Sequence, residues 1–325
     1  MDKVECITIN HAEIKNFTIF EDIDITFDNV NIFIGENATG KTHLLKLLYA
    51  LTRYGNIGSM LYMFGHPNIR RNDSMDVVVN LNNGDVKFTI RQIMPLRWEK
   101  EPYARCLQPY DNCLFIPAKD MLTHAEAIDW LDREYNNKGY FDKTFVDVVH
   151  KAKNPEPDCI PDMAKRVAPK LEKILNGRVV IEKDIFYVLH NDNVKTPFSL
   201  EAEGLKKIGL LWKLLMNGSL KEGTILFWDE PEANINPKLV PVLVDVILEL
   251  SMHGVQIFIA THDYIFAKYV EVKMEEKHKV LFHSLYHTEN GVKCETESSF
   301  SFLENNSILE ESVNLYEEQV KKVLG

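Results

Sequence analysis

The spacing of apolar residues divides the first part of the chain into predicted strands and one helix. Residues 4–9 and 17–27 alternate apolar and polar positions, which predicts two antiparallel strands. The β-branched run 30–34 leads directly into a glycine-containing loop, and residues 43–55 then follow a helical period. We therefore expect a strand, a loop and a helix in immediate succession.

The second half of the chain alternates apolar strands with amphipathic helices. Strands are predicted at 224–228 and 255–260, and helices at 205–216 and 238–254. Buried strands that alternate with helices indicate an α/β sheet covered by helices. A last amphipathic helix is predicted over about 307–324.

Antiparallel pairs and one irregular segment complete the predicted organisation. Hairpins are expected across residues 82–85 and 289–291, where Asn-Gly signals separate β-like runs. Residues 120–176 mix charges with a helical pattern that prolines interrupt. We expect a single domain over 1–325, with an N-terminal antiparallel β subdomain and an inserted, mostly helical subdomain at about 120–176.

Composition and charge exclude some classes of protein. The 325 residues are 45% hydrophobic and 26% charged, as in an ordinary globular protein. The net charge of −11 argues against a protein that coats nucleic acid non-specifically. The five cysteines are scattered without a CxxC pair, and no apolar run is long enough to span a membrane. We therefore expect a cytoplasmic protein with reduced thiols and no membrane segment.

The loop after residue 34 carries the first chemical signature. It reads G-x-x-x-x-G-K-T, a pattern whose backbone N–H groups curl around phosphate oxygens at the start of a helix. Lys41 is expected to reach the β- and γ-phosphates, and Thr42 to offer its hydroxyl to Mg²⁺. The predicted nucleotide-binding residues are Gly35, Glu36, Asn37, Ala38, Thr39, Gly40, Lys41 and Thr42.

Two further signatures follow the apolar strands of the second half. Adjacent carboxylates at Asp229 and Glu230 are costly unless they meet a cation or take part in chemistry. We expect Asp229 to hold Mg²⁺, and Glu230 to orient and deprotonate the attacking water. His262 lies just past the next strand, where it would donate a hydrogen bond to the γ-phosphate. Glu230 and His262 are thus the predicted catalytic residues.

These three signatures, in this order, resemble the ABC-type ATPases and in particular their SMC/RecF/OLD-like branch. The likeness also includes Ile14-Lys15-Asn16-Phe17 and the segment 229–237, DEPEANINP, and it covers about 1–55 and 198–270. The resemblance implies an α/β P-loop NTPase fold with an ABC-type head, in which helices flank a mixed core sheet. It also implies ATP and Mg²⁺ as cofactors, and a homodimer or higher oligomer that sandwiches nucleotide between subunits. The stretch 201–207 is similar to stand-alone ATPase subunits of bacterial anti-phage systems such as Septu.

The chain departs from this family at two places. Where the family has a Ser-Gly signature, this chain has Glu203-Gly204, and we expect the carboxylate to face away because a γ-phosphate would repel it. Gly204, with Lys206 or Lys207, is the candidate for reaching the nucleotide of a second subunit; the alternative is an ordinary helix start with solvated lysines. Lys119 stands where the family has a glutamine, as either a phosphate contact or a surface lysine.

Two basic clusters leave direct binding to nucleic acid open. One lies in the β-rich segment and the other in the helical insertion: Arg70, Arg71, Lys87, Arg91, Arg97 and Lys100; and Lys151, Lys153, Lys165, Arg166 and Lys170. Such residues either track a phosphate backbone or lie on a solvated face, and we favour the solvated face.

The predicted function is ATP binding and hydrolysis that closes and reopens a dimer. Closure would control a separate effector protein, a nuclease or toxin, in anti-phage defence. The alternative is a RecF-like DNA repair ATPase that binds DNA directly, with a salt-dependent affinity. A transporter ATPase is disfavoured because the chain has no Leu-Ser-Gly-Gly-Gln signature.

Overall fold

The structure is a computed structural model that describes residues 6–55, 63, 74–82, 84–94, 97–100, 110–135 and 141–324. For residues 74–75, 84–94 and 97–100 it describes the backbone alone. Within the described residues, none of the helices combines the length and the apolar character that crossing a lipid bilayer demands.

A six-stranded mixed sheet forms the centre of the molecule, with the strand order β14-β13-β3-β12-β11-β7. Five of these strands run parallel, and β14 pairs antiparallel with β13. The strands are β3 (Val30–Ile34), β7 (Cys113–Ile116), β11 (Ile225–Asp229), β12 (Gln256–Ala260), β13 (Val280–Thr288) and β14 (Gly291–Glu297). The predicted mixed sheet and the hairpin across residues 289–291 are confirmed.

Both faces of this sheet are covered, which explains why its central strands are apolar at nearly every position. On one face, Phe227 and Phe258 pack with α1 (Lys41–Tyr54) and the N-terminal strands. On the other face, Trp228 and Ile257 pack with a layer of helices. These helices include α6 (Glu203–Met216), α7 (Val240–Met252) and α8 (Tyr264–Lys273). Successive side chains of a strand point to opposite faces, so two buried faces require a continuous apolar run.

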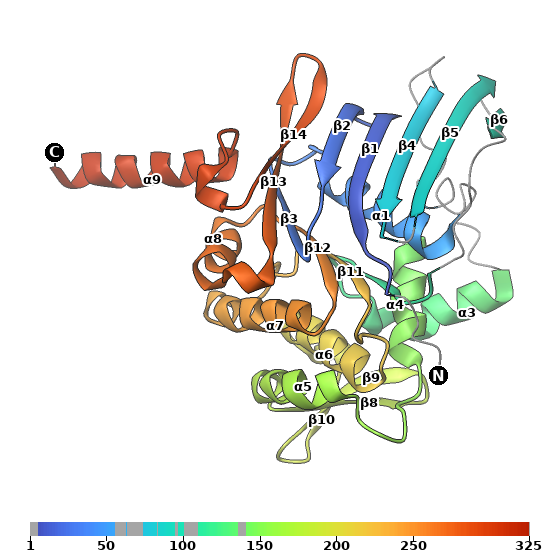
Figure 1. Cartoon of the computed structure of the whole chain (residues 1–325). Coiled ribbons are helices and arrows are strands. Elements are labelled where there is room, and N and C mark those ends of the chain that lie inside the picture. Colours follow the sequence, from blue (N-terminus) through green and yellow to red (C-terminus); the bar gives the residue numbers. More distant parts are fainter. Residues whose placement is uncertain are drawn as a thin grey trace.

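A second, antiparallel sheet covers the α1 side, with the order β2-β1-β4-β5-β6 (Figure 1). Its strands are β1 (Ile9–Phe17), β2 (Phe20–Thr26), β4 (Ser74–Leu81), β5 (Gly84–Met94) and β6 (Arg97–Lys100). The predicted first strand at 4–9 is wrong in position, because the strand begins at Ile9. Thr8 instead pairs through its N–H and its carbonyl with Asn82, at the turn after β4.

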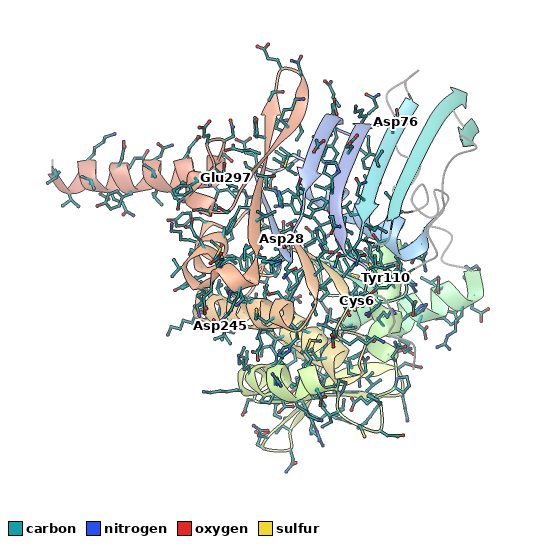
Figure 2. All side chains as sticks on the ribbon, viewed as in Figure 1. Cys6, Asp28, Asp76, Tyr110, Asp245 and Glu297 are labelled. Carbon is teal, nitrogen blue, oxygen red and sulfur yellow. The ribbon has the colours of Figure 1, made fainter. Side chains whose placement is uncertain are left out.

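The Gln256 side chain links the two sheets where β1 and β12 begin. Its amide nitrogen donates to the carbonyl of Ile9 (2.7 Å), and its oxygen accepts from the Ile9 N–H (2.8 Å). The same nitrogen also donates to the carbonyl of Asp28 (3.1 Å), a residue of the connection from β2 to β3 that is labelled in Figure 2. These contacts pair buried polar groups and fix the N-terminal sheet against the core sheet.

The segment predicted as a helical insertion contains α3 (Ala125–Tyr135), α4 (Lys143–Lys153) and α5 (Asp162–Leu175). A small sheet of β8 (Gly177–Glu182), β9 (Ile185–His190) and β10 (Lys195–Pro197) follows. Pro169 lies inside α5 rather than ending a helix, contrary to our expectation. Because its ring is exposed, the helix carbonyl that loses its donor there can be hydrated. The division into domains and subdomains stays a prediction.

The last helix, α9 (Ser307–Leu324), was predicted within a residue of its observed bounds and projects away from the body of the molecule (Figure 1). None of its residues is buried. Its first turns lie beside the loop that follows β3, where Ile308 and Leu315 line a hollow together with Glu36.

Candidate nucleotide site

The loop between β3 and α1 adopts a backbone shape that requires glycine at two positions. Gly35 has φ +141° and Gly40 has φ +89°, both in the left-handed region. A Cβ at Gly35 would lie 2.2 Å from the carbonyl oxygen of Leu285, and one at Gly40 would lie 2.6 Å from the side chains of Ile19 and Phe20. The loop is therefore held tightly, with the N-terminal end of α1 at its exit.

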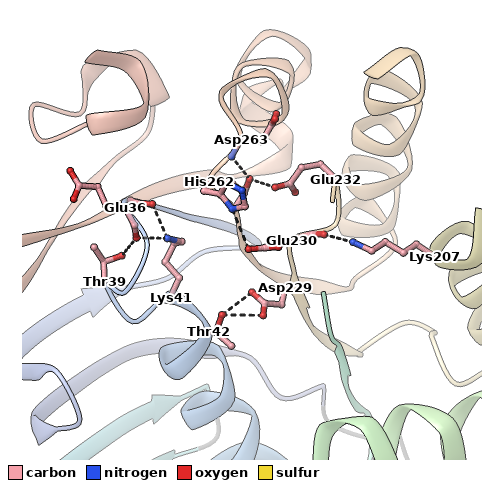
Figure 3. Close-up of polar contacts among 12 residues, drawn as sticks. Glu36, Thr39, Lys41, Thr42, Lys207, Asp229, Glu230, Glu232, His262 and Asp263 are labelled. Atoms are coloured by element: carbon pink, nitrogen blue, oxygen red, sulfur yellow. Dashed lines mark hydrogen bonds and ion pairs between the residues drawn. The ribbon is translucent and has the colours of Figure 1, made fainter. Parts of the chain in front are cut away.

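Lys41 folds back over this loop. Its Nζ donates to the carbonyl oxygens of Gly35 (2.7 Å) and Glu36 (2.8 Å), and the Glu36 carbonyl also accepts from Thr39 Oγ1 (2.9 Å; Figure 3). Burial is the largest influence on the ammonium and lowers the pKa of Lys41, although Glu230 and Asp229 oppose the shift. Both of these hydrogen-bond acceptors are neutral backbone carbonyls of the loop. The Lys41 ammonium therefore has no anionic partner within the loop, and it is placed to bind phosphate oxygens.

Thr42 and Asp229 meet across the site although they lie far apart in the sequence. Thr42 Oγ1 donates to both carboxylate oxygens of Asp229, at 3.0 and 3.1 Å. Burial raises the pKa of Asp229, and the neighbouring Glu230 raises it further while the Thr42 hydrogen bond opposes the shift. A hydroxyl and a hard carboxylate at one point fit Mg²⁺, and a cation there would compensate the buried charge.

Glu230 and His262 form a pair beside that point. Glu230 Oε1 lies 3.2 Å from His262 Nδ1, and the side chains are 34% and 51% exposed, so both are accessible from solvent. Glu230 adopts φ +46°, a strained conformation for a glutamate. Backbone strain of this kind is concentrated at functional sites.

The predicted residues surround a cavity of about 320 Å³. It is lined by Ile19, Asn37, Ala38, Gly40, Lys41, Thr42, His43, Asp229 and Glu230. Gly35, Glu36 and His262 lie on an adjoining hollow of about 580 Å³. The sequence analysis did not include Ile19 or His43. His43 directly follows the phosphate-loop motif, whereas Ile19 comes from the turn between β1 and β2 and only the fold brings it there.

Two predicted nucleotide-binding residues line neither cavity: Thr39, which is buried within the loop, and Gly204, which lies on α6. A Cβ on Gly204 would be 2.8 Å from the carbonyl oxygen of Asn234, so glycine permits α6 to approach the loop after β11. Glu203 is half exposed and pairs with Lys206 (2.6 Å), and its orientation relative to the nucleotide of a second subunit stays a prediction. Lys207 Nζ donates to the carbonyl of Glu230 (2.6 Å). Both lysines are buried and bonded within the chain, so the alternative of solvated lysines is wrong, whereas the contact of Gly204 with a second subunit stays a prediction.

Lys119 and four lysines of the insertion give no support to a phosphate-tracking face. Lys119 is exposed just past β7 and lines neither cavity of the nucleotide site. In the insertion, Lys151, Lys153, Lys165 and Lys170 each pair with a carboxylate. The cluster in the β-rich segment lies outside the side chains that the structure describes. Its members are Arg70, Arg71, Lys87, Arg91, Arg97 and Lys100.

Comparison with known proteins adds two family matches. Residues 119–267 match a family described as "AAA domain, putative AbiEii toxin, Type IV TA system", and residues 8–94 match one described as "AAA ATPase domain". The DNA replication and repair protein RecF of Bacillus mycoides is 30% identical over 128 residues, which cover 34% of this chain and 31% of that protein. RecF of Lactobacillus acidophilus is 52% identical over 48 residues, 14% of this chain and 13% of that protein. The chain thus aligns with less than a third of the length of these relatives.

Solved structures show the same fold over nearly the whole chain. The Smc head domain of Pyrococcus furiosus, bound to the C-terminal domain of ScpA, matches with a TM-score of 0.57 at 13% identity, over 96% of this chain and 99% of that one. An Smc head bound to the C-winged helix domain of ScpA matches with a TM-score of 0.59 at 14% identity, over 89% and 97%. The shared head fold shows that the chain has the α/β fold of an ABC-type ATPase head, and over parts of its length the chain is similar to AAA ATPase domains and to RecF.

Proposed function

We propose that this chain binds ATP with Mg²⁺ in the 320 Å³ cavity and hydrolyses it. The observation that carries the proposal is the meeting of Thr42 with Asp229, directly beside the pair of Glu230 and His262. The phosphate loop would hold the phosphates through its backbone N–H groups and Lys41, while Thr42 and Asp229 would hold the cation. Bound Mg²⁺ would neutralise charge that develops on the phosphate oxygens.

The roles of the catalytic residues follow from their places. The carboxylate of Glu230 is accessible and lines the cavity, so it can accept a proton from the attacking water. His262 lies within contact distance of that carboxylate, where it can orient Glu230 and donate to the γ-phosphate. Lys41 would exchange its two loop carbonyls for phosphate oxygens when nucleotide enters.

We further propose that ATP closes a homodimer or a higher oligomer, with the Gly204 end of α6 facing the nucleotide of a second subunit. Partial exposure of Glu230 and His262 supports this, because a closing partner would remove both from water. The Glu230→Gln variant should bind ATP, hydrolyse it slowly and shift to dimer or larger species in light scattering. If ATP leaves the size of this variant unchanged while binding is measurable, the sandwich mechanism is wrong.

The closed form would control a separate effector, a nuclease or toxin, in the cytoplasm and in anti-phage defence. The description of the family matched by residues 119–267 mentions a toxin–antitoxin system, which supports this choice of partner. In cells that carry the native locus, Lys41→Ala should abolish protection against phage if the proposal holds. Equal protection by the wild type and the variant would exclude control by ATP.

A RecF-like protein that binds DNA directly is the second candidate, supported by the partial RecF relatives. It predicts DNA binding without any partner, with an affinity that falls steeply as salt is raised. Titration of labelled DNA at two salt concentrations separates the two functions. Absence of binding at low salt in the presence of ATP would favour the effector mechanism.

A further inference from the structure

Two buried charged side chains lie beside the catalytic pair and have no part in the mechanism above. Lys207 of α6 is 5% exposed, and Glu232 in the loop after β11 is 8% exposed. Burying a charge is unfavourable unless it gains specific partners. The partners of these two residues therefore indicate what they do.

Lys207 holds the backbone of Glu230 in its strained conformation. Lys207 Nζ donates to the Glu230 carbonyl (2.6 Å), which also accepts from the N–H of Ala233 (3.2 Å). On the other side, the Glu230 N–H donates to the carbonyl of Ala260 (2.8 Å). The positive φ of Glu230 is a strained conformation, so it needs such contacts to persist.

Glu232 holds the loop that carries His262. Its Oε1 accepts from Thr261 Oγ1 (2.6 Å), and the same Thr261 oxygen accepts from the N–H of Asp263 (3.0 Å; Figure 3). His262 lies between Thr261 and Asp263 in the sequence. The second carboxylate oxygen of Glu232 is buried without a hydrogen-bond partner among the described residues. The carboxylate is therefore anchored by one strong contact, to the neighbour of the catalytic histidine.

Together these contacts join three segments that are distant in sequence. At the start of α6, Gly204 packs against Asn234 in the loop after β11. Lys207 of the same helix donates a hydrogen bond to that loop. That loop in turn touches the His262 segment through Glu232. Each member of the catalytic pair is thus held through a buried ionisable side chain that does not itself line the cavity.

We propose that Lys207 and Glu232 are positioning residues that fix Glu230 and His262 relative to each other and connect both to the N-terminal end of α6. This inference rests on the proposed ATPase activity. A movement of that end of α6, as when a second subunit contacts it, would reach the catalytic pair through these two side chains.

The first test separates ATP binding from turnover. Lys207→Met keeps the buried volume but removes the donor, and Glu232→Ala and Thr261→Val each remove the contact to the His262 loop. Each should lower kcat roughly 10- to 100-fold, because small misplacement of catalytic groups is costly, while the KM for ATP changes less than about threefold. Glu232→Gln keeps an oxygen that can accept from Thr261, and should retain kcat within about twofold.

A matched control is available on the same helix. Lys213 is also buried on α6 but pairs with Glu156 (2.5 Å), away from the site. Lys213→Met should therefore leave kcat unchanged, which distinguishes positioning from a general effect of removing a buried lysine. The double variant of Glu232→Ala with Thr261→Val should be no slower than either single variant, because both remove one contact.

The second test needs no activity and so separates this inference from the proposed function. Amide hydrogen exchange of the nucleotide-free protein should become at least about tenfold faster over residues 260–264 in Glu232→Ala, and over residues 229–235 in Lys207→Met. Unchanged exchange in these segments, or accelerated exchange with wild-type kcat, would overturn the positioning roles. If the wild type itself fails to hydrolyse ATP, the proposed function is wrong, and the exchange data alone decide the inference.

Discussion

Replacing Thr42 by valine tests the proposed magnesium site with the least change in shape. Valine fills the same volume but lacks the hydroxyl that donates to both oxygens of Asp229. The carboxylate, already with a raised pKa through burial, would lose the hydrogen bond that opposes that shift. The variant therefore removes the hydroxyl ligand and also disfavours the ionised form of Asp229.

The size of the effect follows from the kind of contact removed. A hydrogen bond to a charged group contributes about 1.5–3 kcal/mol, which corresponds to roughly a 10- to 150-fold loss of affinity. The loss should appear only when Mg²⁺ is present, because the phosphate loop and Lys41 are unchanged. Thr42→Ser keeps the hydroxyl and is the matched control.

Titration with a fluorescent ATP analogue, in Mg²⁺ and in EDTA, measures this difference directly. We expect Thr42→Val to bind like the wild type in EDTA and to gain little affinity when Mg²⁺ is added, whereas Thr42→Ser should gain as the wild type does. An equal loss in both buffers would mean that the hydroxyl supports the loop rather than the cation. Wild-type affinity in both would refute the assignment.

Three further predictions concern other residues of the site. Burial raises the pKa of Glu232 to about 7 in the folded protein, so the ionisation of this acid disfavours folding increasingly as pH rises from about 4.5 to about 7. In urea unfolding at pH 8, Glu232→Gln should therefore be more stable than the wild type, by a few kcal/mol at most. This gain in stability should vanish near pH 4. Gly35→Ala should abolish ATP binding in calorimetry, because its Cβ would lie 2.2 Å from the Leu285 carbonyl oxygen; wild-type affinity would show that the loop can shift. His262→Ala should lower kcat about 100-fold in a phosphate-release assay with little change in ATP affinity, and unchanged kcat would remove His262 from the mechanism.

Local patterns identified most elements because the core sheet lies between two covered faces. The central strands β11 and β12 are each apolar at four of their five positions, and residues 41–54 carry a helical stripe of apolar residues, so the type of each element could be predicted directly. The first strand was misplaced, because Thr8 takes a partner 74 positions away rather than continuing β1. Pro169 was taken as a helix breaker, although an exposed position inside α5 tolerates it.

The sequence by itself determined which groups can bind a nucleotide, because short motifs place backbone N–H groups, Lys41, Thr42 and two carboxylates at the ends of strands. Such groups are local to a loop or a strand end, so their chemistry is visible in the order of residues. Only the tertiary structure decided how they are held. The contacts of Lys207 with the Glu230 carbonyl and of Glu232 with Thr261 join segments that are 23 and 29 positions apart. No periodicity or motif encodes such contacts, since they arise from the packing of α6, β11 and β12 against one another.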